Sequence, residues 1–276
     1  MSTVDGTSGG DPQQTFRTGI GMSTPDTILL LGQDLAHDLI GQVGFGELAF
    51  WLIAKRRPTP AQLAMFDAVL VSLADHGFTP TAIAARLTYT SAPESLQGAV
   101  AAGLLGGGSR FLGVTEDAAR FLSASLAGLA ERPGPGDEAG WDDLAGEVVA
   151  ATKAAGQYVP GLGHPVHKVE DPRTQVLFDL ARRHGTFGDH LELLAAVGRV
   201  HPKILGRTLP LNGAGVCGAV LADLDLPLSV MRGCALLARC AGLLGHLAEE
   251  RADPIGMDVY LGVDRNIDYR PPSENA

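Results

Sequence analysis

The chain has 276 residues, of which 45% are hydrophobic, enough to build a core in one large domain or two smaller ones. Its formal net charge of −10 argues against a nucleic-acid groove, because phosphate binding depends on clustered Lys and Arg side chains. Only 5% of residues are aromatic, Ala, Leu and Gly dominate, and strand-like alternation of Val, Ile and Thr is scarce. The composition therefore predicts an all-α protein.

The first residues are polar and rich in Gly and Ser, without the apolar stretch of a signal peptide, so we expect a disordered tail over 1–25. Three cysteines, Cys217, Cys234 and Cys240, are too few for a disulfide framework and indicate a reducing compartment. The sequence therefore predicts a cytoplasmic protein.

The longest apolar stretch lies around Cys234 to Leu247 and is interrupted by Arg239 and His246. It is shorter than the ~20 residues that a membrane span needs. We therefore expect neither a membrane nor a nucleic acid as a partner.

The first predicted helix, GELAFWLIAKRR, follows Phe45 and ends in a basic run, Lys55 to Arg57, which we interpret as a solvated helix end before Pro58. A second helix is expected over 61–77, with Gly77 as its C′ residue, which places His76 on its last turn. A segment over 80–90 follows without an assigned structure. Further helices are expected over 94–105, 116–130, 143–155, 174–184 and 229–251, followed by a tail that contains Pro and Tyr.

The stretch GLGHPVHKVEDPRTQ, residues 161–175, combines glycines with two histidines, an acid and an arginine. The Gly-x-Gly before His164 lets the backbone approach a ligand closely, because glycine has no Cβ. Nine residues later, Arg173 offers a planar guanidinium that suits bidentate carboxylate binding. A histidine and an arginine on one short element favour a carboxylate substrate. No Walker A motif accompanies the other Gly-rich stretches, so nucleotide binding of that kind is not expected.

GLGHPVHKVEDPR resembles the G-x-G-H-x-V…D-P-R segment of citrate synthases and of the citryl-CoA lyase module of ATP-citrate lyase. LADHGFTPTAIAAR, residues 73–86, is similar to the ADHG element of that module, and SLQGAVAAGLLGGGSRFLG, residues 95–113, to its following small-residue helix and turn. LLARCAGLLGHLAEE resembles the late helix that carries a substrate arginine and then Gly-His. The matches run in order from about Phe45 to Tyr269.

The resemblance implies that His76 and His164 contact a citrate- or oxaloacetate-like group and that Arg173 and Arg239 clamp its carboxylates. Helix capping remains the alternative for His76, and a buried ion pair for Arg239. The resemblance also implies that coenzyme A, as a co-substrate, contacts the loop and two basic residues: Val159, Pro160, Gly161, Leu162, Gly163, Lys203 and Arg207. Solvated surface is the alternative for Lys203 and Arg207. Neither a metal nor a tightly bound cofactor is expected.

The chain departs from the family where the acetyl group reacts. In LNGAGVCG, Asn212 is kept, but Ala214 stands where the family's aspartate falls, and a methyl group cannot accept a proton. Gln97 or a neighbour lies near the place of the synthase's P-L-H-G histidine, and Pro165 replaces an arginine. In the tail, Asp253 stands where an arginine is expected. His76, His164 or a re-aimed Asp223 could serve as another base.

Two functions that involve a ligand follow from this pattern, beside a purely structural alternative. One is a lyase or acyltransferase that makes or cleaves a C–C bond in a citryl-CoA-like thioester. The other is a non-catalytic acyl-CoA or carboxylate-binding homologue, and a structural dimer is a third alternative. The implied fold has a large helical domain, 26–105 plus 223–276, a smaller helical domain, 106–222, and a cleft between them. The resemblance also implies a homodimer.

Overall fold

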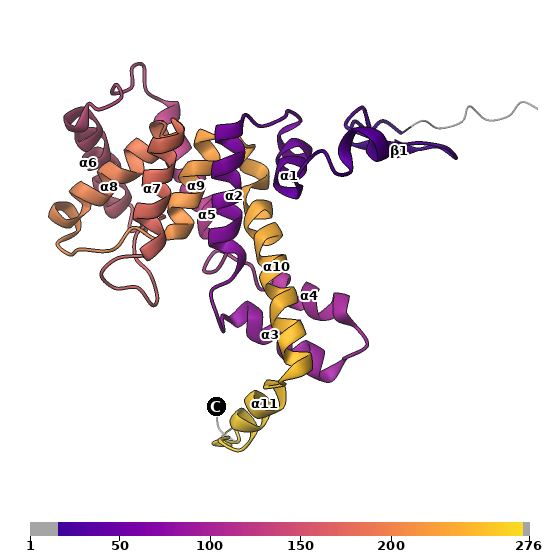
Figure 1. The fold of residues 1–276 in the computed structure, drawn as a ribbon. Helices are drawn as coiled ribbons and strands as arrows, with labels where there is room; N and C mark the ends of the chain where they lie inside the picture. The colour runs from indigo at the N-terminus through magenta and orange to yellow at the C-terminus, as the bar shows by residue number, and fades with distance from the viewer. Residues whose placement is uncertain (1–15, 273–276) are drawn as a thin grey trace, which may run out of the picture.

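A computed structural model describes residues 16–272, and over this range the chain is predominantly helical, which confirms the predicted fold class (Figure 1). The α-helices, in chain order, are α1 (Phe45–Ala54), α2 (Pro60–Ala74), α3 (Pro80–Ser91), α4 (Leu96–Leu105), α5 (Val114–Ala127), α6 (Glu138–Ala154), α7 (Pro172–His184), α8 (Asp189–Leu205), α9 (Gly213–Asp223), α10 (Met231–Ala252) and α11 (Gly256–Asp264). A short π-helix, Leu35–Leu39, and a 3-10 turn, Leu228–Val230, complete the helical elements of the described range.

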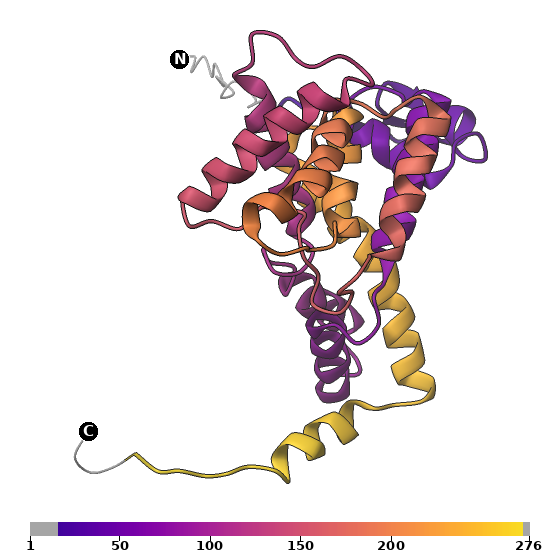
Figure 2. The same ribbon diagram turned by 90° about the vertical axis from the view of Figure 1, so that its left-hand side faces the viewer.

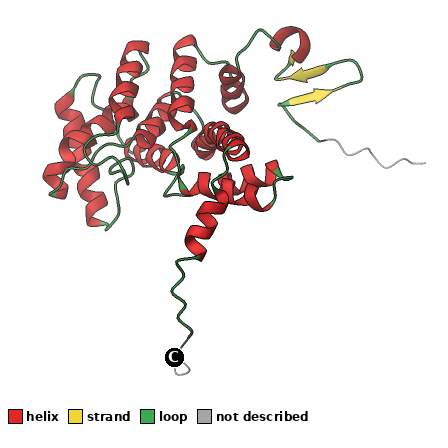
Figure 3. Ribbon diagram, turned by 60° about the horizontal axis from the view of Figure 1, so that its bottom comes forward, coloured by secondary structure: helices red, strands yellow, loops and turns green. Residues whose placement is uncertain are grey.

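A small antiparallel sheet precedes the helices. Its strands, β1 (Gly21–Ser23), β2 (Ile28–Leu30) and β3 (Gln33–Asp34), are joined in the order β1-β2-β3. Figure 3 shows the hairpin, in yellow, standing apart from the helical body. Strand β1 falls within the expected disordered tail, so that expectation is wrong for this part of it. Residues 1–15 lie outside the described residues.

Helix α2 begins as the sequence predicts but ends earlier. Thr59 and Gln62 form a reciprocal capping box, and Pro60 occupies the first turn. The helix stops at Ala74 because Asp75 is extended (φ −143°, ψ 163°) and its carboxylate accepts the backbone N–H of Gly77 at 2.8 Å. His76 therefore lies in the loop that follows α2, and its expected position on the last helical turn is wrong.

The basic run after α1 is a solvated helix end at Lys55 and Arg57, which are exposed, and Lys55 Nζ donates to the Leu52 carbonyl at 2.7 Å, but Arg56 is half-buried. The Arg56 guanidinium donates to Gln62 Oε1 at 2.9 Å and to the Leu224 carbonyl at 2.7 Å. The guanidinium of Arg57 lies 4.3 Å from the centre of the Trp51 ring, a cation–π contact. Arg56 thus fastens the end of α1 to α2 and to Leu224, the residue that caps the end of α9.

One large hydrophobic cluster joins the helices of the upper body, from Phe50 on α1 to Ala238 on α10, and it includes residues of α5 to α9. A smaller cluster lies between α3, α4 and α10. Helices α5 and α9 approach so closely that a Cβ on Gly218 would lie 2.2 Å from the Thr115 carbonyl oxygen. The large cluster runs through both predicted domains, whose boundary stays a prediction.

Helix α8 was not predicted, and its N-terminus is held by a side chain distant in sequence. The Asp223 carboxylate, at the end of α9, accepts the backbone N–H groups of Gly188, His190 and Leu191 at 3.0–3.1 Å. It also contacts His190 Nδ1 at 2.8 Å, and His190 Nε2 lies 3.0 Å from Ser123 Oγ on α5. Asp223 thus serves as a cap that joins three helices, and the suggestion that it acts as a base is wrong.

Helix α10 crosses the molecule from the main body to the lower group of α3, α4 and α11 (Figures 1 and 2). In the described part of the chain, the stretch Leu228–Ala252 is the one long and apolar enough to cross a membrane, judged by length and composition only. The apolar stretch expected from the sequence, around Cys234 to Leu247, was therefore too short. The helix packs against α2, α3, α4 and α5, and it carries two buried charged side chains, Arg239 and Glu250, which are rare unless they are paired.

Candidate active site

The loop between α6 and α7 is shaped by its glycines and by Asn212. Gly161 and Gly163 have φ values of +90° and +84°, a region that favours glycine. The Asn212 backbone N–H donates to the Gly161 carbonyl at 2.9 Å, and Asn212 Nδ2 donates to the Gly163 carbonyl at 2.8 Å. A Cβ on Gly215 would lie only 2.5 Å from the Gly161 Cα, so the loop rests directly on the first turn of α9.

His164 follows this turn, and its backbone surroundings fix its tautomer. Its Nδ1 accepts the backbone N–H groups of Val166 at 3.1 Å and His167 at 2.9 Å. Because Nδ1 accepts these bonds, the proton of the neutral ring lies on Nε2. Burial is the largest effect on His164, and together with the charges of His167, His76 and Arg173 it lowers the pKa to about 4 against the opposing charge of Asp171. His164 is therefore a neutral N–H donor at neutral pH.

Three imidazole rings gather here. The His164 ring centre lies 4.4 Å from that of His167 and 5.3 Å from that of His76, and one nitrogen from each ring falls within 4.8 Å of the others. A metal ligand needs a free lone pair, whereas His164 Nδ1 is hydrogen-bonded and its Nε2 is protonated. The arrangement therefore favours hydrogen-bond donation by His164 over metal ligation.

Asp171 is fully buried and binds the N-termini of two helices as well as Arg173. It caps α7 through the Arg173 backbone N–H at 3.1 Å and accepts the Gly213 backbone N–H of α9 at 2.7 Å. Arg173 Nε and Nη2 donate to its two oxygens at 3.0 and 2.7 Å. Burial acts to raise the pKa of Asp171, but these hydrogen bonds and the charge of Arg173 hold it well below its usual range.

Arg173 is therefore part of an ion pair, and its Nη1 donates to the Ser72 carbonyl at 3.1 Å. Burial acts to lower the pKa of Arg173, but Asp171 raises it overall. One edge of the guanidinium is taken up by Asp171, so a bidentate clamp on a substrate would have to use the remaining N–H groups. Sequence reasoning identified Arg173 but missed the role of Asp171.

Arg239, on α10, differs from Arg173 in having poor partners. It is 4% exposed, and its Nε has no hydrogen-bond partner within residues 16–272. Its Nη1 lies 3.4 Å from Thr79 Oγ1 and 3.9 Å from Asp75 Oδ1. Burial lowers the pKa of Arg239, with Asp75 opposing and Arg173 adding to the effect. A buried guanidinium with donors to spare is costly unless an anion completes its bonds.

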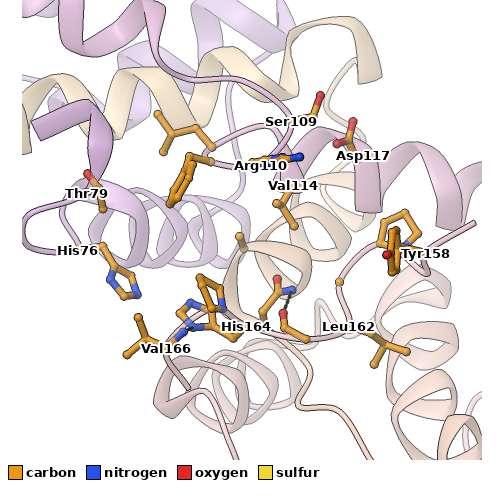
Figure 4. Close-up of a pocket in the computed structure, with 18 of the residues that line it drawn as sticks. His76, Thr79, Ser109, Arg110, Val114, Asp117, Tyr158, Leu162, His164 and Val166 are labelled. Atoms are coloured by element: carbon orange, nitrogen blue, oxygen red, sulfur yellow. Dashed lines mark hydrogen bonds between the residues drawn. The ribbon is translucent and has the colours of Figure 1, made fainter. Parts of the chain in front are cut away.

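A cavity of about 960 Å³ joins these groups (Figure 4). His76, His164 and Val166 lie at one side of the view, and Tyr158 and Asp117 lie at the other. The lining includes most of the predicted site residues, namely His76, Val159, Pro160, Gly161, Leu162, Gly163, His164, Arg173, Asn212, Ala214 and Arg239. The fold therefore brings together, around one cavity, residues that the resemblance selected and that are distant in the chain.

Other predicted residues lie elsewhere. Gln97 is exposed on α4, away from the cavity-lining residues, and Val114 and Arg110 form the wall beside α5. Gln97 therefore contributes nothing to the cavity lining in the described part of the chain. Arg207 lines a neighbouring pocket of about 430 Å³ that shares Tyr158 with the main cavity, whereas Lys203 is exposed and lines neither of these two pockets. The CoA contacts of both basic residues stay predictions.

Comparison with known proteins identifies the family and the fold. The model of the citrate synthase C-terminal domain matches residues 25–257. The structure of citryl-CoA lyase from Hydrogenobacter thermophilus is similar with a TM-score of 0.81 and 28% identity, over 95% of this chain and 98% of that one. ATP citrate lyase from Methanothrix soehngenii, in complex with citrate and coenzyme A, aligns with a TM-score of 0.75 and 24% identity over 96% of this chain and 43% of that one.

A curated relative, citrate synthase of Synechocystis, is 26% identical over 235 residues, which cover 82% of this chain and 55% of the relative. The chain thus spans about half the length of the curated citrate synthases that it matches. The family model covers most of the chain, and the fold agrees with it. The protein therefore belongs to the citrate synthase family.

Proposed function

We propose that this protein makes or cleaves the carbon–carbon bond of a citryl-CoA-like thioester. The observation that carries the proposal is Arg239, a buried guanidinium with an unpaired Nε at a cavity that also contains the Nε2–H group of His164. A carboxylate would supply the acceptors that these donors lack. Relatives bind such ligands, since ATP citrate lyase is described with citrate and coenzyme A.

In the cleavage direction, the hydroxyl proton of the citryl group leaves, and the bond between the hydroxyl-bearing carbon and the thioester's α-carbon breaks. The electron pair passes to the thioester as an enolate, which then takes up a proton. His164 cannot take the hydroxyl proton at Nε2, because that nitrogen already bears one. It instead donates a hydrogen bond to the oxygen that becomes the ketone, a fixed dipole that needs no reorganisation.

His76 is then the base available beside His164, because it lines the cavity and His167 does not. Asp223 caps α8 instead. Ala214 lies at the cavity and carries no carboxylate, so the proton that the family's aspartate handles must move by another group or by water. Asp117 is the one carboxylate-bearing residue that lines the cavity in the described chain, and Figure 4 shows it well apart from His164. The proposed reaction therefore uses a changed set of proton carriers.

A non-catalytic acyl-CoA or carboxylate-binding role is the second candidate, and Ala214 is the observation that favours it. Calorimetry with citrate, oxaloacetate and acetyl-CoA tests binding, and mass spectrometry after incubation with citryl-CoA, or with acetyl-CoA plus oxaloacetate, tests turnover. Binding with turnover supports the enzyme. Binding without turnover, in either direction and with a panel of other acyl-CoAs, supports the second candidate. No binding by any of these ligands would contradict both.

We further propose that the protein is a homodimer. Helix α11 and the segment after it extend away from the body (Figure 2), and they expose Met257, Tyr260, Val263, Ile267 and Tyr269. Apolar residues exposed on one projecting arm are typical of a surface that packs against another chain. Light scattering at micromolar concentration should give twice the mass of 28.7 kDa. A monomeric mass would contradict the proposal.

A further inference from the structure

The loop that carries His76 is held from behind by a chain of polar contacts. Asp75 immediately precedes His76, and its Oδ2 accepts the Gly77 backbone N–H at 2.8 Å, which bends the loop around His76. Its Oδ1 is the nearest carboxylate oxygen to Arg239, at 3.9 Å from Nη1. The direction of this one carboxylate thus affects both the His76 loop and the buried guanidinium at the cavity.

His246, on α10, contacts the same Asp75 oxygen. His246 Nε2 lies 2.9 Å from Asp75 Oδ1, and the His246 side chain is 10% exposed. On its other edge, His246 Nδ1 lies 3.2 Å from Arg86 Nε and 3.1 Å from Arg86 Nη2. Because a guanidinium can only donate, Nδ1 must accept, and the proton of the ring lies on Nε2, directed at Asp75.

Arg86 is itself fixed. It is 2% exposed, donates to Glu250 Oε2 at 2.9 Å and contacts Glu249, while its guanidinium lies 5.1 Å from the centre of the Phe78 ring. Glu250 also accepts the backbone N–H of Gly256 at 2.7 Å, at the start of α11. A continuous series of contacts therefore runs from Glu250 through Arg86 and His246 to Asp75.

We propose that His246 is a positioning residue for the carboxylate-binding end of the cavity: it holds Asp75 in the direction that shapes the His76 loop and orients Arg239. The inference rests on the proposed function for its ligand, but its geometry can be tested without one. His246 lies outside the cavity lining of the described chain. If its role were purely structural, any change in ligand affinity on substitution would therefore follow the change in stability.

Two amide substitutions separate the two edges of the ring. Counted in bonds from Cβ, the Asn amide lies where Nδ1 does, and the Gln amide lies where Nε2 does. His246→Gln can therefore still donate to Asp75, whereas His246→Asn can still accept from Arg86 but loses Asp75. Each variant loses one of the two contacts, so the two should have similar melting temperatures.

Calorimetry with citrate should give His246→Gln an affinity close to that of the unchanged protein. For His246→Asn, affinity should fall about ten-fold, the size expected when one hydrogen bond to a charged group is lost. Equal affinities for both variants, whether unchanged or equally reduced, would overturn the proposal. Affinities that simply follow the melting temperatures would also overturn it.

A second measurement needs no ligand. Hydrogen exchange of the Gly77 amide should be faster in His246→Asn than in His246→Gln, because Asp75 loses the contact that orients it. The Gly140 amide, which donates to Asp137 at 3.0 Å in a distant helix cap, is the internal control. Unchanged Gly77 exchange in both variants would overturn the positioning role. Absence of citrate binding by the unchanged protein would count against the proposed function, and the exchange result would still decide the geometry.

Discussion

Replacing Asp171 by asparagine should destabilise the protein by about 3 kcal/mol at neutral pH, because it leaves a largely buried arginine without its counter-charge. Asp171 is fully buried and receives N–H groups from Arg173 and from the first turn of α9. An asparagine has one acceptor oxygen, so one pair of these donors would face its NH₂ group. Breaking a buried pair costs about 3–5 kcal/mol, and we take the lower figure because the Arg173 side chain is 20% exposed and water can reach it.

The sign of the pH dependence follows from the lowered pKa of Asp171. A carboxylate whose pKa is lower in the folded state stabilises the protein fully above its unfolded value of about 3.9. That stabilisation is lost as the pH falls toward the folded pKa. The difference in stability between the unchanged protein and Asp171→Asn should therefore be largest at neutral pH and shrink below about pH 4.

Urea denaturation at a series of pH values measures this difference. The matched control is Asp179→Asn on α7, since the Asp179 side chain is 55% exposed and accepts from Gln175 at 2.8 Å. The control should change stability by no more than about 0.5 kcal/mol. A loss below about 1 kcal/mol for Asp171→Asn at pH 7, or a loss that stays constant down to pH 3, would refute the reasoning about this ion pair.

Three other substitutions test the cavity. Arg239→Gln should weaken citrate binding by about 2–4 kcal/mol in calorimetry; normal binding with a much lower melting temperature would instead mark Arg239 as structural. Ala214→Asp should reduce the native turnover, because an unpaired anion in the cavity repels a carboxylate-bearing ligand; a gain in citryl-CoA cleavage, followed by mass spectrometry, would contradict this. Gly215→Ala should lower the melting temperature and the citrate affinity together, because its Cβ would lie 2.5 Å from the Gly161 Cα and push the loop outward; an unchanged protein would show that the loop can move freely.

The parts of the fold that the sequence predicts well are those whose signals are local. Helix α7 begins after Asp171, which caps it, and ends at Gly185 in a left-handed conformation, so both of its ends are marked in the sequence. Helix α8 is marked in the sequence at one end only, by the left-handed Gly206 that follows it. Its N-terminal N–H groups are capped by Asp223 from α9, and Pro202 lies inside it, so no local cap marks where it begins and propensity argues against its last turn.

The site shows the same division. The Gly-x-Gly turn and the position of Ala214 follow from the motifs, and both line the cavity. The loop position of His76 does not follow, because an apolar helix pattern continues up to it and the stop comes from the Asp75 side chain. Whether Arg173 is free or paired also depends on where Asp171 points, which spacing along the chain cannot specify.

The close contact between α5 and α9 at Gly218 limits how this scaffold can diverge. Because the backbones of the two helices already touch there, no larger residue can replace Gly218 without separating the helices. The distance between these two walls is therefore set by main-chain atoms, whereas Val114, on the α5 wall, and Ala214, on the α9 wall, project side chains that can vary. New substrate preferences in such a protein would arise from exchanges at these lining positions, while the frame that carries them stays constant.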